Sequence, residues 1–517
     1  MMMPVIQPKH ISMLLAGMLE NSDVINDVRV VGISMNSRMV QKGGLFLSLS
    51  LKMEQRCIYL QQALDAGVMA VVFDKEQPLS DKELSLLAEA GVNVYRVSNL
   101  AANAGEIAAR FYEHPSQAVT IIAITGTNGK TSVSQFIAQA LESLGHACGI
   151  VGTLGVGRID SLQATGMTTP DPVTLQALLA GFRQHDVDTV VIEASSHALD
   201  QGRLNSIAID VAVFTNLSRD HLDYHQDMSE YASAKKQLFD FVSLKAAVIN
   251  AADEFGQTLI SSIASMGDVS LITYSSQPDD LTSLQAKDIQ TRCDGLHFSV
   301  IGESGSACIQ SSLLGRFNVD NLLAALASLM AVDISFDLAV SAIKRCHSVQ
   351  GRMQSYGGDS RPHVVIDFAH TPDALAQALQ SLRTHMSPQA HLWCVFGCGG
   401  DRDTGKRALM GQCAESNADV VVLTDDNPRS EDNDAIIRDI LSGISEPEKV
   451  YIEHNRELAI TYALDHAESV DIVLVAGKGH EQYQEISGVK YPFSDADAVI
   501  KVLDAANDDL HSVGAKQ

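Results

Sequence analysis

The chain has 517 residues and a formal net charge of −26, with 46% hydrophobic and 19% charged residues. This composition is typical of globular domains. The acidic balance excludes a general nucleic-acid or anionic-membrane surface, although a polyanionic substrate could still bind cations focused in a cleft. The length predicts about three domains. The apolar stretch at residues 11–19 is too short to span a bilayer and lacks a basic leader, so we expect a cytoplasmic protein without membrane insertion.

The first block of the chain, residues 1–112, alternates short apolar strands with helical patterns. A helix is predicted at 58–66, and strands are predicted at 30–33, 45–49, 70–73 and 92–97. The segment Glu113-His-Pro-Ser then indicates a linker, because proline restrains the residue before it to extended geometry. We expect this block to form a smaller N-terminal α/β domain.

Two further blocks, residues 113–348 and 349–517, contain short apolar strands separated by helix-length segments. The predicted strands lie at 119–125, 190–193, 211–215, 246–249, 364–367, 392–396, 420–424 and 472–476. This spacing is typical of βαβ units with buried parallel strands. We therefore predict an α/β protein with a central P-loop domain, built on a doubly wound and mostly parallel sheet, and a C-terminal Rossmann-like sheet. Ligands of such sheets bind beyond the carboxyl ends of the strands.

Residues 121–132, IIAITGTNGKTS, combine a strand, a glycine turn and the start of a helix. Glycines in such a turn let backbone N–H groups surround phosphate oxygens, while Lys130 supplies a cation and Thr131 a magnesium-binding hydroxyl. Ile124 replaces the first glycine of the full P-loop pattern, so a purely structural turn is the alternative. We interpret the loop as a nucleotide site formed by Gly126, Thr127, Asn128, Gly129, Lys130, Thr131 and Ser132.

Polar residues follow the next predicted strands of the second block. Glu193 ends one strand, His221 follows another, and Lys235 lies in the helical segment after it. Mg²⁺ prefers hard oxygen ligands and commonly bridges substrate phosphates, so Thr131 and Glu193 suit one ion. His221 is a softer ligand, and an ammonium group cannot bind a cation. The chemistry alone therefore leaves a structural role open for His221 and Lys235.

The loop TGTNGKTS resembles the ATP loop of the Mur ligases and of the related folylpolyglutamate synthetases, and the resemblance to Mur ligases covers nearly the whole chain. It implies an ATP-dependent, amide-forming ligase of peptidoglycan precursor synthesis. A substrate carboxylate would take the γ-phosphoryl group of ATP, and an amine would attack the resulting acyl phosphate. The resemblance also implies a second Mg²⁺ at His221 and a CO₂-derived carbamate that makes Lys235 an oxygen ligand. The implied catalytic residues are Lys130, Glu193, His221 and Lys235, with Asn318 and Arg352 as further ATP contacts.

The same resemblance implies a site for UDP-N-acetylmuramoyl-L-Ala-D-Glu. Its residues here are Met35, Ser37, Thr168, Thr169, Ser195, Gln201 and Arg203. Asn36 stands where the family usually has aspartate, and Phe368 replaces a tyrosine, which removes a hydroxyl group. The segment after Phe46 lacks the expected glycine-rich stretch, so the sequence leaves open whether residues 52–56 contact the uridine.

The segment Asp425-Asp-Asn-Pro-Arg429 contains the motif Asp-Asn-Pro-Arg, which in this family marks enzymes that add meso-diaminopimelate. The chemistry agrees, because Arg402 and Arg429 can each bind a carboxylate bidentately while Asp426 and Glu481 receive an ammonium group. Lysine lacks the distal carboxylate and would leave a buried guanidinium without a partner. The implied amino-acid site comprises Arg402, Asp426, Asn427, Pro428, Arg429, Gly477 and Glu481. A simple proline turn is the structural alternative.

Several other functions compete with this interpretation: a ligase that adds L-lysine, a Mur ligase that adds another residue, a folylpolyglutamate synthetase, and a nucleotide-gated module without catalysis. The synthetase would not explain residues 36–38 or Asp-Asn-Pro-Arg, and the module would not need Glu193 or Lys235. We therefore expect a monomer that acts on small molecules. Residues 1–112 would bind the UDP-muramoyl substrate, 113–348 ATP, and 349–517 the diamino acid.

Overall fold

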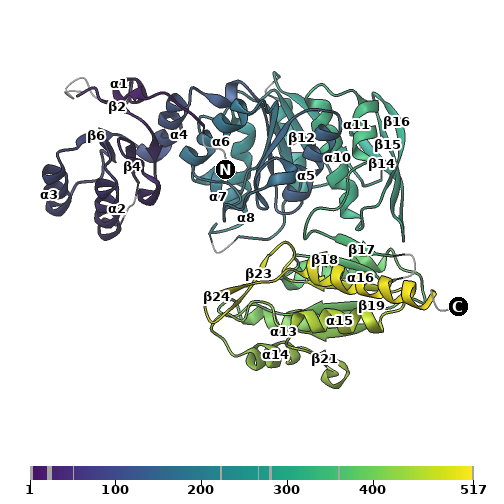
Figure 1. Cartoon of the computed structure of the whole chain (residues 1–517). Helices are drawn as coiled ribbons and strands as arrows, with labels where there is room; N and C mark the ends of the chain where they lie inside the picture. The colour runs from purple at the N-terminus through teal and green to yellow at the C-terminus, as the bar shows by residue number, and fades with distance from the viewer. Residues whose placement is uncertain are drawn as a thin grey trace. The chain divides into compact units, whose positions relative to one another are not determined.

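The computed structural model describes residues 4–19, 26–49, 52–221, 224–265, 267–278, 282–358 and 361–514, the last ten of these by their backbone only. These residues form two compact units. One comprises residues 1–285 and 321–343, and the other comprises residues 286–320 and 344–517. The chain leaves the first unit within β14 (Leu284–Arg292) and returns to it within α10 (Phe317–Ala331) (Figure 1). The boundaries of the three predicted domains stay a prediction.

The N-terminal part of the first unit contains a small parallel sheet with the order β3-β4-β5-β6. Its elements are α1 (Ile11–Leu14), β3 (Ile33–Ser34), β4 (Leu45–Ser48), α2 (Met53–Asp65), β5 (Ala70–Asp74), α3 (Asp81–Ala90), β6 (Asn93–Val97) and α4 (Leu100–Phe111). Successive side chains of a strand point to opposite faces. Leu45 and Leu47 accordingly pack with α1 and α4, while Phe46 packs with α2 and α3.

The strand predicted at residues 30–33 is wrong, because the chain divides there between two sheets. Val30 belongs to β2 (Arg29–Val30), which pairs antiparallel with β1 (Lys9–His10), whereas Ile33 opens β3 and pairs parallel with Leu45. Between them, the Val31 N–H donates to the carbonyl of Gly43 instead of continuing a ladder. Hydrophobic character alone does not reveal such a change of partner.

The large sheet has the strand order β16-β15-β14-β13-β12-β11-β7-β10-β8-β9. Its further elements are β7 (Thr120–Thr125), α5 (Lys130–Ser143), β8 (Cys148–Gly152), β9 (Gly155–Gly157), α6 (Pro172–Gln184), β10 (Thr189–Glu193), α7 (Ser196–Asp200), β11 (Val211–Phe214), α8 (Met228–Lys236), β12 (Ala246–Asn250), α9 (Glu254–Ala264), β13 (Ser270–Ser275), β15 (Gly295–Gly302), β16 (Gly305–Ser311) and α11 (Phe336–Ile343). Strands β8, β10, β7, β11, β12 and β13 are parallel, which confirms the parallel arrangement predicted for β7, β10, β11 and β12; β8 and β13 were not predicted. The carboxyl ends of β7, β10 and β11 therefore meet at one edge, where Thr125, Glu193 and Phe214 end their strands.

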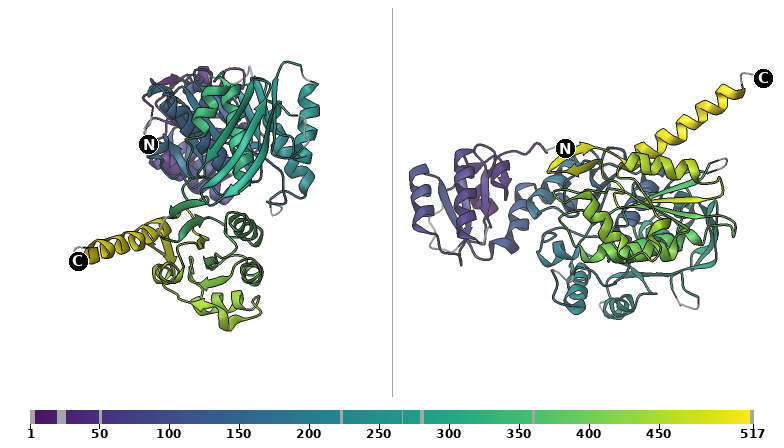
Figure 2. Two further views of the ribbon diagram at one scale, coloured as in Figure 1. Left: turned by 90° about the vertical axis from the view of Figure 1, so that its right-hand side faces the viewer. Right: turned by 90° about the horizontal axis from the view of Figure 1, so that it is seen from below.

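The second unit contains a sheet with the order β17-β18-β22-β19-β20-β21, in which all pairs except β17 with β18 are parallel. Its elements are β17 (Gln354–Gly357), β18 (His363–Asp367), α12 (Pro372–Arg383), β19 (Leu392–Phe396), α13 (Gly405–Asn417), β20 (Val420–Leu423), α14 (Asn433–Leu441), β21 (Tyr451–Ile452), α15 (Arg456–His466), β22 (Ile472–Ala476), β23 (Tyr483–Ile486), β24 (Val489–Pro492) and α16 (Asp495–Gly514). Helices α12, α13 and α14 cover one face, and α15 and α16 cover the other (Figure 2). The predicted α/β class with doubly wound sheets is confirmed.

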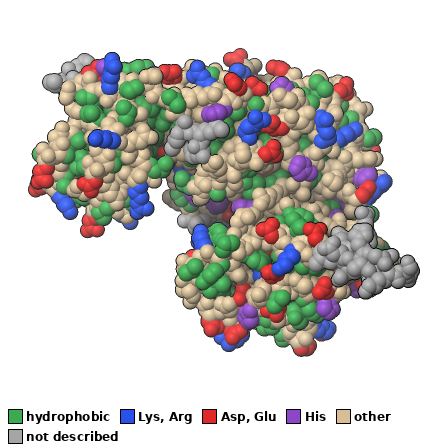
Figure 3. Space-filling model, in the orientation of Figure 1, with side chains coloured by type: hydrophobic (Ala, Val, Ile, Leu, Met, Phe, Trp, Pro, Cys, Tyr) green, Lys and Arg blue, Asp and Glu red, His purple; other side chains and the backbone are tan. Residues whose placement is uncertain are grey.

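The surface of the described residues gives two simple observations. No helix among them is long and apolar enough to cross a membrane. On the face that Figure 3 shows, Lys and Arg side chains are interspersed with Asp and Glu rather than gathered in one basic stripe.

A buried ion pair joins α2 to the start of α3. The Arg56 guanidinium binds both carboxylate oxygens of Glu83 and also donates to the Pro78 carbonyl at 2.9 Å. Both side chains are at most 5% exposed. Glu83 also accepts from the Ser80 N–H, which completes a capping box at the start of α3. These contacts give Arg56 a structural role between α2 and α3.

Substitution of Glu83 by Gln should destabilise this part of the chain by about 3–5 kcal/mol, the cost of breaking a buried ion pair. The matched change Glu106→Gln, in the partly exposed α4 pair with Arg110, should cost about 1 kcal/mol or less. Hydrogen exchange of α2 and α3 amides in each variant measures the difference. Equal protection in both variants would contradict the assignment.

The same ion pair predicts a pH dependence. Burial raises the pKa of Glu83, but hydrogen bonds from Arg56 and Ser80 outweigh burial and leave that pKa lowered. The stabilisation is therefore complete above the unfolded value of about 4.5 and is lost as the pH falls through the lower folded value. The free energy of unfolding of α2 and α3, followed by hydrogen exchange, should therefore fall more steeply below about pH 4.5 in the wild type than in Glu83→Gln, which lacks this titrating group.

Candidate functional site

The glycine loop between β7 and α5 closes against the end of β11. Gly126 has φ 147°, and a Cβ there would lie 1.9 Å from Thr215 Oγ1. Gly129 has φ 86°, and its Cβ would lie 2.5 Å from Asn321 Oδ1. Only glycine satisfies both the positive φ and the close approach. The loop thus leads directly into the N-terminus of α5, which favours an anion.

Hydrogen bonds from the segment after β11 hold the loop in place. The Thr127 N–H donates to the Asn216 carbonyl at 2.8 Å, and the Asn128 N–H donates to Asn216 Oδ1 at 2.9 Å. Thr215 Oγ1 donates to the Asn128 carbonyl at 2.6 Å. The loop therefore keeps its shape through bonds made by a neighbouring strand end.

Two lysines converge on one carbonyl oxygen of this loop. Lys130 Nζ donates to the Gly126 carbonyl at 2.7 Å, and Lys235 Nζ donates to the same oxygen at 2.8 Å. Lys235 is 1% exposed and lies 4.2 Å above the ring of Tyr231. Burial first, and then the charge of Lys130, hold the pKa of Lys235 well below its usual value. Burial and the neighbouring cation therefore both disfavour the protonated form of this amine.

Glu193 is fully buried at the end of β10 and accepts several hydrogen bonds. Thr131 Oγ1 donates to it at 2.8 Å, Thr153 Oγ1 at 2.9 Å and the Thr153 N–H at 3.0 Å. The predicted pair Thr131 and Glu193 thus lies together, with two hard oxygen donors at the start of α5. Thr153 belongs to this group as well, and no sequence motif pointed to it.

Five residues predicted for the muramoyl-peptide gather around the same strand end. Thr169 Oγ1 donates to the Glu193 carbonyl at 2.6 Å and to Ser195 Oγ at 3.3 Å, while Thr168 Oγ1 lies 3.1 Å from Thr153 Oγ1. The Arg203 guanidinium donates to the Thr169 carbonyl at 2.7 Å and to Gln201 Oε1 at 2.6 Å. A cation and several hydroxyl groups are therefore assembled beside Glu193.

His221 lies in a cluster of aromatic rings next to Lys235. Its ring centroid is 5.1 Å from that of His197 and 6.0 Å from that of Tyr231, whose hydroxyl lies 3.2 Å from Thr127 Oγ1. Tyr231 thereby connects the glycine loop to both His221 and Lys235. Within the described ranges, no group of three or more His, Cys, Asp or Glu side chains is arranged to hold a metal ion.

Met35 and Ser37 lie in the N-terminal sheet region. Ser37 is 5% exposed and donates to Gln62 Oε1 at 2.7 Å, and Met35 packs against the core below α1 and α4. Asn36, the departure from the family pattern, accepts from the Arg38 N–H and so caps a short 3₁₀ turn, Ser37–Met39. Asparagine serves this local capping role as well as aspartate does.

Asn318 and Arg352, predicted for ATP, belong to the second unit. Asn318 Nδ2 donates to the Leu314 carbonyl at 2.7 Å. The Arg352 guanidinium carbon lies 5.1 Å from the ring centroid of Phe368, which in turn lies 5.3 Å from that of His480. Phe368 therefore keeps a ring for stacking with the cation, although it lacks the hydroxyl of tyrosine.

The Asp-Asn-Pro-Arg segment follows β20 and is held by the segment after β22. Asn427 is 3% exposed: its Nδ2 donates to Glu481 Oε2 at 2.8 Å, and its Oδ1 accepts from Lys478 Nζ at 3.1 Å and from the Glu485 N–H at 2.9 Å. A Cβ on Gly477 would lie 2.6 Å from Asp426 Oδ2, so these two predicted residues also lie in contact.

The two predicted arginines flank one glycine. A Cβ on Gly399 would lie 3.0 Å from Arg429 Nη1 and 3.8 Å from Arg402 Cγ. Arg429 Nη1 donates to the Gly400 carbonyl at 2.7 Å, and its Nε lies 3.3 Å from Glu485 Oε2. The hairpin of β23 and β24 also fixes its backbone, because the Arg429 N–H donates to the Glu485 carbonyl at 3.0 Å.

Sequence reasoning missed Lys478 and Glu485 as members of this site. Lys478 stands inside the motif Gly-Lys-Gly-His-Glu and is fully buried, so an apolar strand followed by a lysine between glycines was a usable signal. Nothing in the sequence pointed to Glu485, which reaches Arg429 only because the hairpin folds back.

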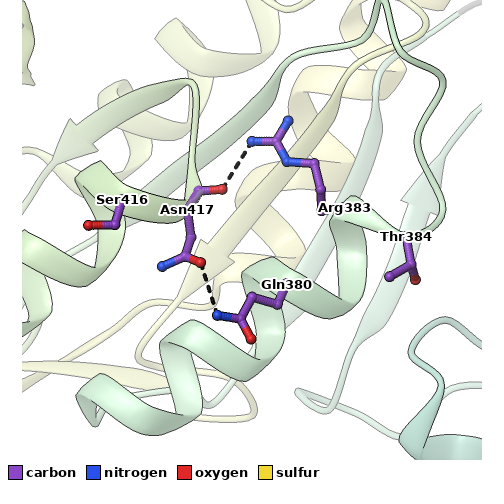
Figure 4. Close-up of a pocket in the computed structure, with 5 residues that line it drawn as sticks. All are labelled: Gln380, Arg383, Thr384, Ser416 and Asn417. Atoms are coloured by element: carbon purple, nitrogen blue, oxygen red, sulfur yellow. Dashed lines mark hydrogen bonds between the residues drawn. The ribbon is translucent and has the colours of Figure 1, made fainter.

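A surface cavity of about 350 Å³ lies elsewhere in the second unit, between α12 and α13. It is lined by Gln380, Arg383, Thr384, Ser416 and Asn417, and two hydrogen bonds cross it, from Gln380 and Arg383 to Asn417 (Figure 4). It includes none of the predicted site residues.

Two family models match the regions that contain the ten-stranded and six-stranded sheets. The model described as Mur ligase middle domain matches residues 124–329, and the model described as Mur ligase, glutamate ligase domain, matches residues 351–479. These ranges contain the glycine loop, Glu193 and Lys235 in the first match, and the Asp-Asn-Pro-Arg segment in the second.

Full-length relatives agree with the family models. The UDP-N-acetylmuramoyl-L-alanyl-D-glutamate–2,6-diaminopimelate ligase of Xanthomonas campestris pv. campestris (strain 8004) is 45% identical over 494 residues, which is 95% of this chain and 97% of the relative. The enzyme of the same name from Ectopseudomonas mendocina (strain ymp) is 46% identical over 463 residues, 90% of this chain and 93% of the relative. A solved structure of a ligase of that name has 36% identity and a TM-score of 0.72, covering 97% of this chain and 100% of its own. The chain belongs to the Mur ligase family.

Proposed function

We propose that this Mur ligase uses ATP to join UDP-N-acetylmuramoyl-L-Ala-D-Glu to meso-diaminopimelate, releasing ADP and phosphate in the synthesis of peptidoglycan precursors. The observation that carries the choice of amino acid is the pair Arg402 and Arg429 beside Gly399, in the same unit as Asp426 and Glu481. Such a pocket suits an amino acid whose far end carries both a carboxylate and an ammonium group. The names of the relatives support this choice.

The glycine loop supplies the proposed phosphate site. Backbone N–H groups of residues 126–131 and the N-terminus of α5 would receive the phosphates of ATP, with Lys130 as the adjacent cation. In the structure Lys130 Nζ donates to the Gly126 and Thr127 carbonyls, so these bonds would be exchanged for phosphate oxygens. The substrate carboxylate oxygen would then form a bond to the γ-phosphorus while the bond between the γ-phosphorus and the leaving oxygen of ADP breaks.

Thr131 and Glu193 would hold Mg²⁺, because their oxygens lie 2.8 Å apart at the phosphate end of α5. The bound ion would neutralise charge on the phosphates. Carbamate formation on Lys235 also fits, since its Nζ is buried beside Lys130 and its pKa is lowered, which makes available the neutral amine that reacts with CO₂. As a carbamate, Lys235 would supply oxygen ligands near His221.

The second step would join the two substrates. The amine nitrogen of diaminopimelate would attack the carbonyl carbon of the acyl phosphate, forming the amide bond. The carbon–oxygen bond to phosphate would break with its electron pair, and the nitrogen would lose a proton to solvent. Arg203, Gln201 and Thr169 would orient the muramoyl-peptide, and Arg402, Arg429 and Glu481 the amino acid. We further propose a cytoplasmic monomer with domains at residues 1–112, 113–348 and 349–517.

The purified protein should release phosphate when given ATP, Mg²⁺, UDP-N-acetylmuramoyl-L-Ala-D-Glu and meso-diaminopimelate. L-lysine or L-glutamate should support much less release, because lysine lacks the distal carboxylate that the arginines would bind and glutamate lacks the distal ammonium that Asp426 and Glu481 would receive. A coupled phosphate assay with each amine in turn measures this. Absence of release with every amine would refute the ligase assignment, and a preference for lysine would refute the role of Arg429.

Arg429→Lys should lower kcat/KM for diaminopimelate about 10- to 100-fold, the equivalent of one charge-assisted hydrogen bond, while the KM for ATP stays unchanged. Arg438→Lys, at an exposed position of α14, is the matched control and should leave both constants unchanged. A parallel rise of both KM values in Arg429→Lys would indicate a structural role instead.

Lys235→Ala should lose activity that a short carboxylic acid such as acetate partly restores, because a free carboxylate can take the place of the carbamate. The neighbouring Lys236→Ala, whose ammonium pairs with Asp240 on the surface, should keep its activity and show no response to acetate. Initial rates across an acetate titration test the carbamate, and no restoration would count against it.

A further inference from the structure

Lys478 is a buried cation at the centre of the proposed amino-acid site. It follows β22 and is 0% exposed. Its Nζ lies 3.0 Å from Glu481 Oε2, donates to Asn427 Oδ1 at 3.1 Å, and lies 3.9 Å from Asp426 Oδ1. One ammonium group thus contacts Asn427 and both carboxylates expected to receive the substrate.

The charges of these three side chains do not cancel. Asp426 and Glu481 carry two negative charges when ionised and Lys478 carries one positive charge, so the group has a net charge of −1. The far end of meso-diaminopimelate presents one ammonium group, together with a carboxylate that the arginines can bind. The net charge of −1 on the group therefore matches the single positive charge of the substrate ammonium.

We propose that Lys478 is a positioning and specificity residue for the diamino acid: it holds Asn427 and Glu481 in one arrangement and leaves one negative charge for one substrate ammonium. This inference rests on the proposed function and adds to it a residue that contacts the recognising groups rather than the reacting atoms. Removing the ammonium would leave the buried carboxylate of Asp426 and the half-buried carboxylate of Glu481 without the cation between them, which is unfavourable unless one of them binds a proton.

Several segments supply the titratable and charged groups around Lys478 and its two carboxylate neighbours. Asp426 follows β20, His480 and Glu481 follow Lys478 itself, and the Tyr483 ring centroid in β23 lies 5.9 Å from Lys478 Nζ. Arg456 opens α15 and forms a buried ion pair with Asp495, which opens α16, and the charges of both act on Asp426. Burial raises the pKa of Asp426, although Arg456 and Lys478 oppose this rise. Burial would also raise the pKa of Glu481, but Lys478 and Asn427 outweigh it and leave that pKa lowered.

Loss of Lys478 should therefore raise the pKa of both carboxyl groups. As the pH falls, the variant would take up a proton in the pocket and lose its attraction for the substrate ammonium, whereas the wild type would keep Glu481 ionised. The expected signature is a KM for diaminopimelate that climbs at acidic pH in the variant more steeply than in the wild type.

The test compares Lys478→Met and Lys478→Arg with the matched control Lys501→Met, which removes a lysine paired with Glu457 on the surface. For each variant, kcat and the KM values for ATP, UDP-N-acetylmuramoyl-L-Ala-D-Glu and diaminopimelate are measured between about pH 6 and 9, together with the melting temperature. Lys478→Met should raise the KM for diaminopimelate about 10- to 100-fold, and further at low pH, with the KM for ATP within twofold. Lys478→Arg should restore most of the affinity, and the control should behave as the wild type.

A double variant separates charge balance from folding. Lys478→Met with Glu481→Gln again has a net charge of −1 in the pocket, so it should melt at a higher temperature than Lys478→Met and lose the extra pH dependence. An unchanged KM for diaminopimelate, an equal rise of all three KM values, or the same pH profile in the single and double variants would overturn the inference while the wild-type activity stands. Absence of wild-type phosphate release would overturn the proposed function and this inference together.

Discussion

The first unit depends on the close approach of Gly126 to Thr215, because this contact brings the end of β7 against the end of β11. No side chain can occupy the space, since a Cβ would lie 1.9 Å from the threonine oxygen. The other contacts of the proposed phosphate site depend on that approach. Asn216 can bond the loop, the Gly126 carbonyl reaches Lys235 in α8, and α5 begins with its N–H groups directed to the same edge as Glu193.

Each unit buries a lysine, Lys235 in the first and Lys478 in the second, and the neighbours of the two ammonium groups differ in charge. Lys235 lies beside the ammonium group of Lys130 and donates to a backbone carbonyl, and burial together with the charge of Lys130 disfavours its protonated form. Lys478 is equally buried, but its ammonium group lies beside Glu481, Asn427 and Asp426. Burial alone therefore does not decide what a lysine does, and the sign of its neighbours does.

Much of the architecture could be predicted from short apolar runs, because parallel strands buried on both faces are continuous in sequence. Thr131 and Glu193 could be placed together for the same reason, since both follow strands of one sheet edge. The strand at 30–33 failed because neighbouring residues pair in different sheets. Thr153 and Glu485 could not be foreseen, because each reaches the site through a turn or hairpin whose docking depends on tertiary contacts. The Lys478 contacts likewise depend on two strand ends that only folding brings together.

The ion pair between Arg429 and Glu485 has a consequence for how a substrate is received. The guanidinium already contacts a carboxylate of the protein and the Gly400 carbonyl, so it is not a bare cation waiting for an anion. In the proposed site, an incoming carboxylate would exchange with Glu485 or bind beside it. Affinity at Arg429 would then be a difference between two similar interactions, and discrimination would rest on geometry more than on total charge. An anion that merely neutralises Arg429 gains little, whereas one that also reaches Arg402 gains a contact that Glu485 does not provide.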